Sequence, residues 1–83
     1  MNNQRVFEET IITKQTKQDK LGRDYLLLEL DNTERIFVFS SKVSKEKWSN
    51  LEESKKYEFT VEDGNNGSNL LVDFYSLEET SFF

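Results

Sequence analysis

The side chains available for chemistry are carboxylates, amines and hydroxyls, because the 83-residue chain contains no histidine and no cysteine. General bases and nucleophiles are therefore limited to Asp, Glu, Lys, Ser and Tyr, and zinc would have to rely on carboxylates alone. The candidates that remain are three pairs of adjacent glutamates, Glu8-Glu9, Glu52-Glu53 and Glu78-Glu79. Strand neighbours point to opposite faces, which separates the first pair, and the other two are typical of solvated surface. We therefore expect a binding protein, not an enzyme, with no metal and no cofactor.

The segment Gly64-Asn65-Asn66-Gly67 lacks the pattern of a phosphate-binding loop, since no Gly-Lys-Ser/Thr follows it and no helix is expected after it. The spacing of carboxylates around it also differs from that of a calcium-binding loop. Asp-Gly and Asn-Gly dipeptides are typical of turns. This segment therefore predicts a turn between two strands.

Five segments have the composition and periodicity of β-strands. The first is rich in β-branched residues, the second and third carry apolar side chains on both faces, and the fourth alternates cleanly between apolar and polar side chains. In the fourth, Tyr57 and Phe59 lie inward, and in the fifth, Leu70, Val72 and Phe74 share one face; we expect Tyr57, Phe59 and Phe74 in the core. The predicted strands are residues 6–16, 24–31, 35–40, 56–62 and 68–75.

One helix is expected, at residues 44–54. Ser44 is suited to cap its first turn through the hydroxyl, and Val43 and Trp48 have the spacing of a hydrophobic staple. Trp48 and Leu51 form a narrow apolar stripe. We therefore expect Trp48 to plug one end of the sheet.

The predicted order is β-β-β-α-β-β, which is mainly β. Three strands, a helix and a final hairpin match the OB-fold, a five-stranded partly open barrel, over roughly residues 5–77. We accordingly expect one OB-like domain at residues 1–77 and a short acidic tail at residues 78–83. An antiparallel sheet covered by one helix is the alternative, whereas SH3-like barrels lack a helix at this point.

Basic residues gather in and beside the predicted loop at residues 18–23, and again on and after the third strand. Only Asp19 offsets the first group, so residues 14–23 carry a net charge of +3. OB-folds bind oligonucleotides on the face of strands two and three, flanked by this loop, where cations meet phosphates. The two groups are Lys14, Lys17, Lys20 and Arg23, then Arg35, Lys42, Lys45 and Lys47.

Tyr25, Leu27, Phe37 and Phe39 share one face of the predicted hairpin of strands two and three. If the aliphatic residues of the other face fill the interior, these rings face solvent and form a stacking platform for unpaired bases. The reverse assignment, with the phenylalanines in the core, stays open. The predicted nucleic-acid-binding residues are Lys14, Lys17, Lys20, Arg23, Tyr25, Arg35, Phe37 and Phe39.

The C-terminal residues 77–83 are acidic and end in two phenylalanines. With the predicted fold, the chain resembles small single-stranded-DNA-binding proteins of the OB type, many of which carry an acidic tail tipped by phenylalanine that docks on partner proteins. The resemblance implies partner binding by Glu78, Glu79, Phe82 and Phe83, and competition between the tail and DNA for the basic groove. The tail is shorter than the bacterial type and lacks its aspartate run and proline. A frayed terminus is the other interpretation.

Two functions follow. The first is binding of single-stranded DNA or RNA without sequence specificity, in a minimal protein from a phage, plasmid or other mobile element. The second is an acidic protein-interaction module or inhibitor of a host enzyme, since residues 51–83 carry two basic and eight acidic side chains of a chain with net charge -5. The exposed rings equally suit a homodimer contact. The acidic residues of the second hypothesis are Glu52, Glu53, Glu58, Glu62, Asp63, Asp73, Glu78 and Glu79.

The location expected from the sequence is the cytoplasm. No apolar run approaches the roughly 20 residues of a membrane span. The N-terminal residues 1–5 are not followed by the apolar region of a signal peptide, and the lack of cysteine suits a reducing compartment. We expect no membrane partner.

Overall fold

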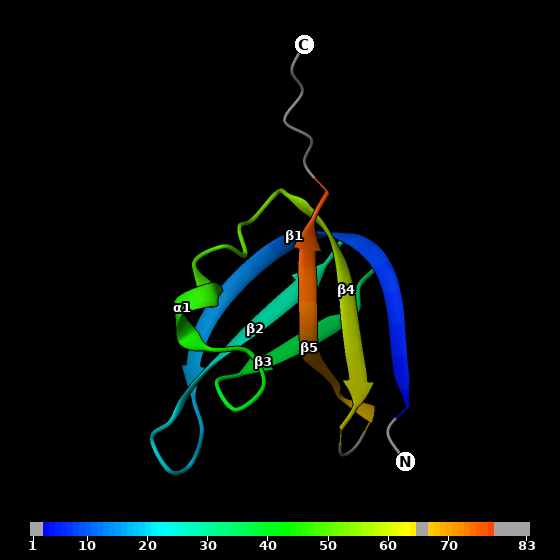
Figure 1. Cartoon of the computed structure of the whole chain (residues 1–83). Helices are drawn as coiled ribbons and strands as arrows, with labels where there is room; N and C mark the ends of the chain where they lie inside the picture. The colour runs from blue at the N-terminus through cyan, green and yellow to red at the C-terminus, as the bar shows by residue number, and fades with distance from the viewer. Residues whose placement is uncertain (1–2, 65–66, 78–83) are drawn as a thin grey trace.

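A computed structural model describes residues 3–64 and 67–77. They form a mainly β structure in which a single sheet of five strands closes on itself in the order β1-β2-β3-β5-β4 (Figure 1). One short helix, α1, lies between β3 and β4. The elements are β1 Gln4–Gln18, β2 Asp24–Leu30, β3 Arg35–Phe39, α1 Lys45–Trp48, β4 Lys56–Asp63 and β5 Asn69–Ser76. The order of strands and helix is the one predicted, and the bounds differ at most ends.

Strands β2 and β3 form the predicted antiparallel hairpin and settle which face is buried. Their aliphatic side chains are at most 3% exposed and fill the interior. The side chains that alternate with them are partly exposed on the outside. Of the two assignments that the sequence left open, the structure has the one with the aliphatic face inside, because only one face of each strand can meet the core. The buried residues of the hairpin are Leu26, Leu28, Leu30, Ile36 and Val38.

Strand β1 is longer than the predicted residues 6–16 and belongs to both halves of the ring. Its first part, up to Thr10, pairs with β4, and its second part, from Ile11, pairs with β2. The register shifts between Ile11 and Thr13, and Ile12 is 48% exposed while Ile11 is fully buried. A bulge bends a strand and increases its twist, so this irregularity lets one strand serve two neighbours, as the curvature of β1 in Figure 1 shows.

The β4–β5 hairpin corrects the predicted face of the fifth strand. Leu71 is fully buried, whereas Leu70, Val72 and Phe74 were expected to share one face. The β4–β5 register shifts between Thr60 and Val61, which adds a residue to β5 and interrupts its alternation. Tyr57 and Phe59 are in the core as predicted, and Phe74 packs against it.

The ring closes between β3 and β5, which run parallel and pair at Phe37 and Leu70. Asn69 reinforces this junction, because its side-chain amide donates a hydrogen bond to the Arg35 carbonyl at 3.1 Å. The sequence alone did not predict this contact, which joins residues more than thirty positions apart.

Helix α1 spans only Lys45–Trp48, much less than the predicted residues 44–54, and the Ser44 side chain makes no cap hydrogen bond. The reason lies in Tyr57, whose hydroxyl accepts a hydrogen bond from the Glu52 amide at 2.8 Å and donates one to the Asn50 carbonyl at 2.6 Å. These bonds satisfy backbone groups that a longer helix would pair internally. Trp48 and Leu51 are nevertheless buried as expected.

No helix within the described residues is long and apolar enough to cross a membrane.

Candidate nucleic-acid interface

The outer side of β2 and β3 carries a cluster of aromatic rings, which we call the aromatic face and define as Tyr25, Leu27, Phe37 and Phe39. The register places Tyr25 opposite Phe39 and Leu27 opposite Phe37. The ring centroids lie 5.4 Å apart for Tyr25 and Phe39, 6.0 Å for Tyr25 and Phe37, and 6.5 Å for the two phenylalanines, whose planes differ by 9°. Each ring is partly exposed. The rings therefore support one another and still present surface to solvent.

Strand β1 extends this face by one further row of side chains. Lys17 pairs with Tyr25, and Gln15 pairs with Leu27. Directly paired residues point to the same side of a sheet, so Lys17, Tyr25 and Phe39 form one row across three strands. Lys17 is exposed and makes no ion pair with any residue that the structure describes. An unpaired ammonium group thus lies beside the rings.

At the end of β2 and the start of β3, the aromatic face is bordered by polar side chains that bond to one another. Glu29 accepts a hydrogen bond from the Thr13 hydroxyl at 3.0 Å. Its carboxylate also forms an ion pair with Arg35 Nε at 3.2 Å. The Arg35 side chain is 63% exposed, so its terminal amino groups remain open to solvent. Arg35 therefore lies on the predicted face, with part of its charge offset by Glu29.

The β1–β2 loop brings Lys20 and Arg23 to the other end of the face. Asp19 organises this loop: its carboxylate accepts hydrogen bonds from the Leu21 and Arg23 amides, each at 2.9 Å, and from Arg23 Nε at 2.8 Å. The bond from the Arg23 amide is the main cause that lowers the pKa of Asp19, followed among the favourable causes by that from the guanidinium. Gly22 takes a φ of 80°, which favours glycine. The loop is thus fixed by its own side chains.

Lys14 does not join this face. It pairs with Leu28, whose side chain is in the core, so it leaves β1 on the inner side. Its ammonium group donates a hydrogen bond to the Trp48 carbonyl at 2.8 Å. Lys14 therefore ties β1 to the end of α1, away from the aromatic face.

Two of the three predicted basic residues after β3 are engaged with carboxylates. Lys42 pairs with the buried Glu62 at 2.7 Å, and Lys45 pairs with Asp24 at 3.0 Å. The hydrogen bond from Lys45 is the main cause that lowers the pKa of Asp24. Lys47 is exposed on α1. Only Lys45 among them is linked to the loop side of the aromatic face, through Asp24 at the start of β2.

The other outer side of the ring is acidic. Strand pairing places Glu8 opposite Glu58 and Glu58 opposite Tyr75, and Asp73 lies in the next row, opposite Thr60. We call Glu8, Glu58, Asp73 and Tyr75 the acidic face. Tyr75 is 59% exposed, and its hydrogen bond to Asp73 raises the pKa of its phenol. Two glutamates directly opposite each other repel, so this face is electrostatically unfavourable by itself.

Two sets of residues are not shared by the predicted and the described site: the C-terminal residues and the two serines after β3. The predicted partner-binding residues Glu78, Glu79, Phe82 and Phe83 lie outside the described residues. Ser40 and Ser41, which were not among the predicted site residues, line a pocket with Arg23 and Phe39. The one feature of the sequence that could have indicated them is their position directly after Phe39, the last aromatic residue of β3.

The chain matches no protein-family model, and no curated protein matches it. The candidate interface therefore depends on geometry alone.

Proposed function

We propose that this protein is an OB-like domain that binds single-stranded nucleic acid on its aromatic face. The strand order, the helix between β3 and β4, and the parallel β3–β5 contact support the fold. OB-folds bind oligonucleotides on the face of strands two and three. It acts by binding and not by catalysis.

The observation that carries this proposal is the row Lys17, Tyr25 and Phe39. A cation without an ion pair stands at the edge of a platform of mutually packed, partly exposed rings. Bases stack on such rings regardless of their identity, and the ammonium group neutralises a phosphate of the same strand. Lys20, Arg23 and Arg35 add cations at both ends of the platform. Lys14 is not part of the interface.

The test is a fluorescence-anisotropy titration of the full chain with labelled oligo-dT at low salt, repeated at increasing salt. We expect binding that weakens steeply as salt rises, because phosphate neutralisation releases counterions. A duplex of equal length should bind more weakly, since its bases are not free to stack. Absence of binding to oligo-dT at tens of micromolar protein would refute the proposal.

A second candidate, a protein-interaction module, is favoured by the pairing of Glu8 with Glu58 beside the exposed Tyr75. A basic partner would relieve the repulsion between the two carboxylates. In that case an oligo-lysine peptide would shift the amide resonances of β4 and β5, and oligo-dT would leave those of β2 and β3 unchanged. The reverse pattern would support nucleic-acid binding.

A further inference from the structure

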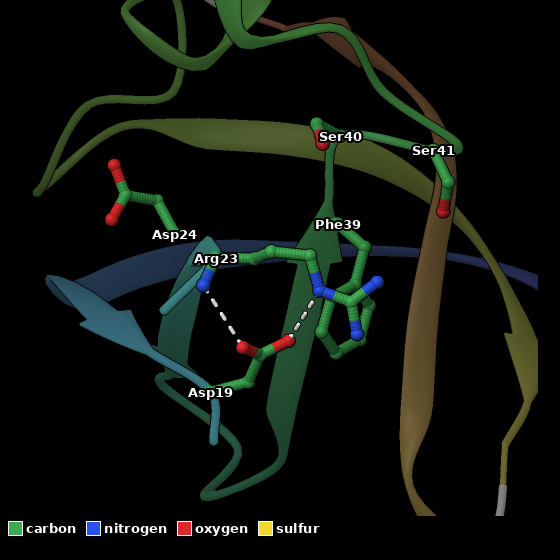
Figure 2. Close-up of a pocket in the computed structure, with 6 residues that line it drawn as sticks. All are labelled: Asp19, Arg23, Asp24, Phe39, Ser40 and Ser41. Carbon is green, nitrogen blue, oxygen red and sulfur yellow. Dashed lines mark hydrogen bonds and ion pairs between the residues drawn. The ribbon is translucent and has the colours of Figure 1, made fainter. Parts of the chain in front are cut away.

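A shallow pocket of about 150 Å³ opens between the β1–β2 loop and the segment that follows β3. Phe39 belongs both to this pocket and to the aromatic face, so the two are continuous. Figure 2 shows the Arg23 side chain extending past the Asp19 carboxylate toward the side of the pocket where Phe39 lies. The lining residues are Asp19, Arg23, Asp24, Phe39, Ser40 and Ser41.

Arg23 is held at one nitrogen and open at the other two. Its Nε donates to Asp19 at 2.8 Å (Figure 2), and no residue that the structure describes bonds to its terminal amino groups. The side chain is 73% exposed. Asp19 is itself bound by two loop amides, so it fixes the direction of the guanidinium. Two parallel donors of this kind match two oxygens of a phosphate group.

Each of the two carboxylates of the pocket is paired with a cation, and the pair with Asp19 also offsets part of the charge of Arg23. Asp19 pairs with Arg23, and Asp24 accepts hydrogen bonds from Lys45 at 3.0 Å and from Gln18 at 3.2 Å. Their pKa values are lowered by these hydrogen bonds and by those of the loop amides. The groups left to meet a ligand are therefore mainly donors, which favours an anion.

Ser40 and Ser41 supply further donors on the other wall. Both are exposed, and neither hydroxyl has a hydrogen-bond partner within residues 3–64 and 67–77. A hydroxyl donates readily to an anionic oxygen. The pocket therefore combines a fixed guanidinium, two hydroxyls and the edge of a stacking platform.

We propose that this pocket holds one phosphodiester group of the bound strand, between the Arg23 guanidinium and the hydroxyls of Ser40 and Ser41, while an adjoining base stacks on the aromatic face. This inference rests on the function proposed above and adds the place where the strand is held. A phosphate contact of this kind fixes the position of the strand without reading its sequence.

The experiment is an anisotropy titration with oligo-dT over a range of salt concentrations, for the wild type, Arg23→Gln, Arg23→Lys and the Ser40→Ala/Ser41→Ala double variant. Lys56→Gln, on β4, is the control for loss of one positive charge. Circular dichroism confirms the fold of each variant, all of which change exposed side chains. Oligo-dT with neutral methylphosphonate linkages is the second probe.

Each variant has its own expected result. Arg23→Gln should weaken binding roughly tenfold and reduce the slope of log affinity against log salt by about 0.7, the contribution of one phosphate contact to a single strand. Arg23→Lys should keep the slope but lose several-fold in affinity, since lysine lacks the planar pair of donors. The serine double variant should lose several-fold with the slope unchanged, because it removes no charge.

With the methylphosphonate probe, the wild type and Arg23→Gln should bind equally, since the phosphate charge is gone. Arg23→Gln indistinguishable from Lys56→Gln on ordinary oligo-dT would overturn the pocket while the proposed function stands. A difference that persists on the neutral probe would also overturn it, because Arg23 would then act through the loop alone. If the wild type does not bind oligo-dT, both proposals fail together.

Discussion

The two outer sides of the ring are built on the same pattern and carry opposite chemistry. Both are rows of side chains that alternate with a shared core, and β1 contributes its second half to the aromatic face and its first half to the acidic face. On the aromatic face the rows contain Lys17, Tyr25 and Phe39, whereas on the acidic face a row contains Glu8, Glu58 and Tyr75. Burial alone therefore does not distinguish the faces; the residue types at the outward positions do.

Each face also carries a tyrosine, which makes the comparison direct. Tyr25 packs against two other rings next to an unpaired cation. Tyr75 is more exposed but is bonded to Asp73 and lies opposite a glutamate. An exposed ring is consequently not sufficient for a stacking site, since neighbouring carboxylates repel the phosphates that accompany a base.

The largest expected effect comes from removing one ring on each face. Tyr25→Ala should weaken oligo-dT binding roughly 5- to 150-fold, which corresponds to the loss of about 1–3 kcal/mol of stacking. Tyr75→Ala should change the affinity by less than about twofold, as a surface substitution outside the interface. Anisotropy titration measures both, with thermal melts to confirm that each variant is folded. Equal losses for the two variants would contradict the assignment of binding to one face.

A smaller effect is expected from single lysines. Lys17→Gln should weaken binding several-fold and lower the salt slope by about 0.7, because Lys17 lies beside Tyr25 without an ion pair. Lys56→Gln, on the side of the ring that includes β4, should leave the slope unchanged. A slope that falls equally in both variants would mean that the cations act through the net charge of the protein rather than at a site.

Reversing one charge on each face should change the free energy of unfolding in opposite directions. Glu58→Lys should raise the free energy of unfolding by about 0.2–1 kcal/mol, since it replaces a repulsive cross-strand pair with Glu8 by an attractive one. Glu29→Lys should lower it, by about 1 kcal/mol, because Glu29 binds both Thr13 and Arg35. Urea unfolding followed by circular dichroism measures both changes. The same sign for the two substitutions would contradict the described pairing.

The smallest effect is expected from pH. The lowered pKa values of Asp19 and Asp24 mean that their stabilising bonds are complete above the ordinary value of 3.8 and are lost only as pH falls through the lower folded values. Without histidine, no side chain has an ordinary pKa near neutrality. Affinity for oligo-dT should therefore differ by less than about twofold between pH 5.5 and 8. A midpoint within that range would show that another group controls the loop.

The strands and their order along the chain could be predicted from the sequence, whereas the buried face of the β2–β3 hairpin could not, because apolar side chains occupy both faces of these two strands. The predicted face was wrong in β5, where the alternation of inward and outward side chains is interrupted. The register shift opposite Thr60 and Val61 of β4 brings Leu71 of β5 inward, and no pattern within β5 indicates it. The helix was predicted too long because the groups that end it, above all the Tyr57 hydroxyl, come from a later strand.

The sequence predicted the kinds of residue in the candidate site and their approximate place, but not which individual cations belong to it. The cluster of cations near residues 14–23 identified the loop, and the rings of β2 and β3 identified the platform. Lys14 and Lys17 look equivalent in the sequence, yet they differ by an odd number of positions on one strand and so point to opposite sides. Lys14 bonds to the Trp48 carbonyl, whereas Lys17 joins the row of Tyr25 and Phe39. Ser40 and Ser41 meet Arg23 only in the folded chain.

By itself, the sequence determined the number, the type and the chain order of the elements, since these follow from local periodicity. Tertiary structure decided which cations stand beside the rings, which are paired with carboxylates, and where the loop of Asp19 and Arg23 meets the hydroxyls after β3. Those relationships depend on register, bulges and contacts between residues far apart in the chain, and no local pattern encodes them.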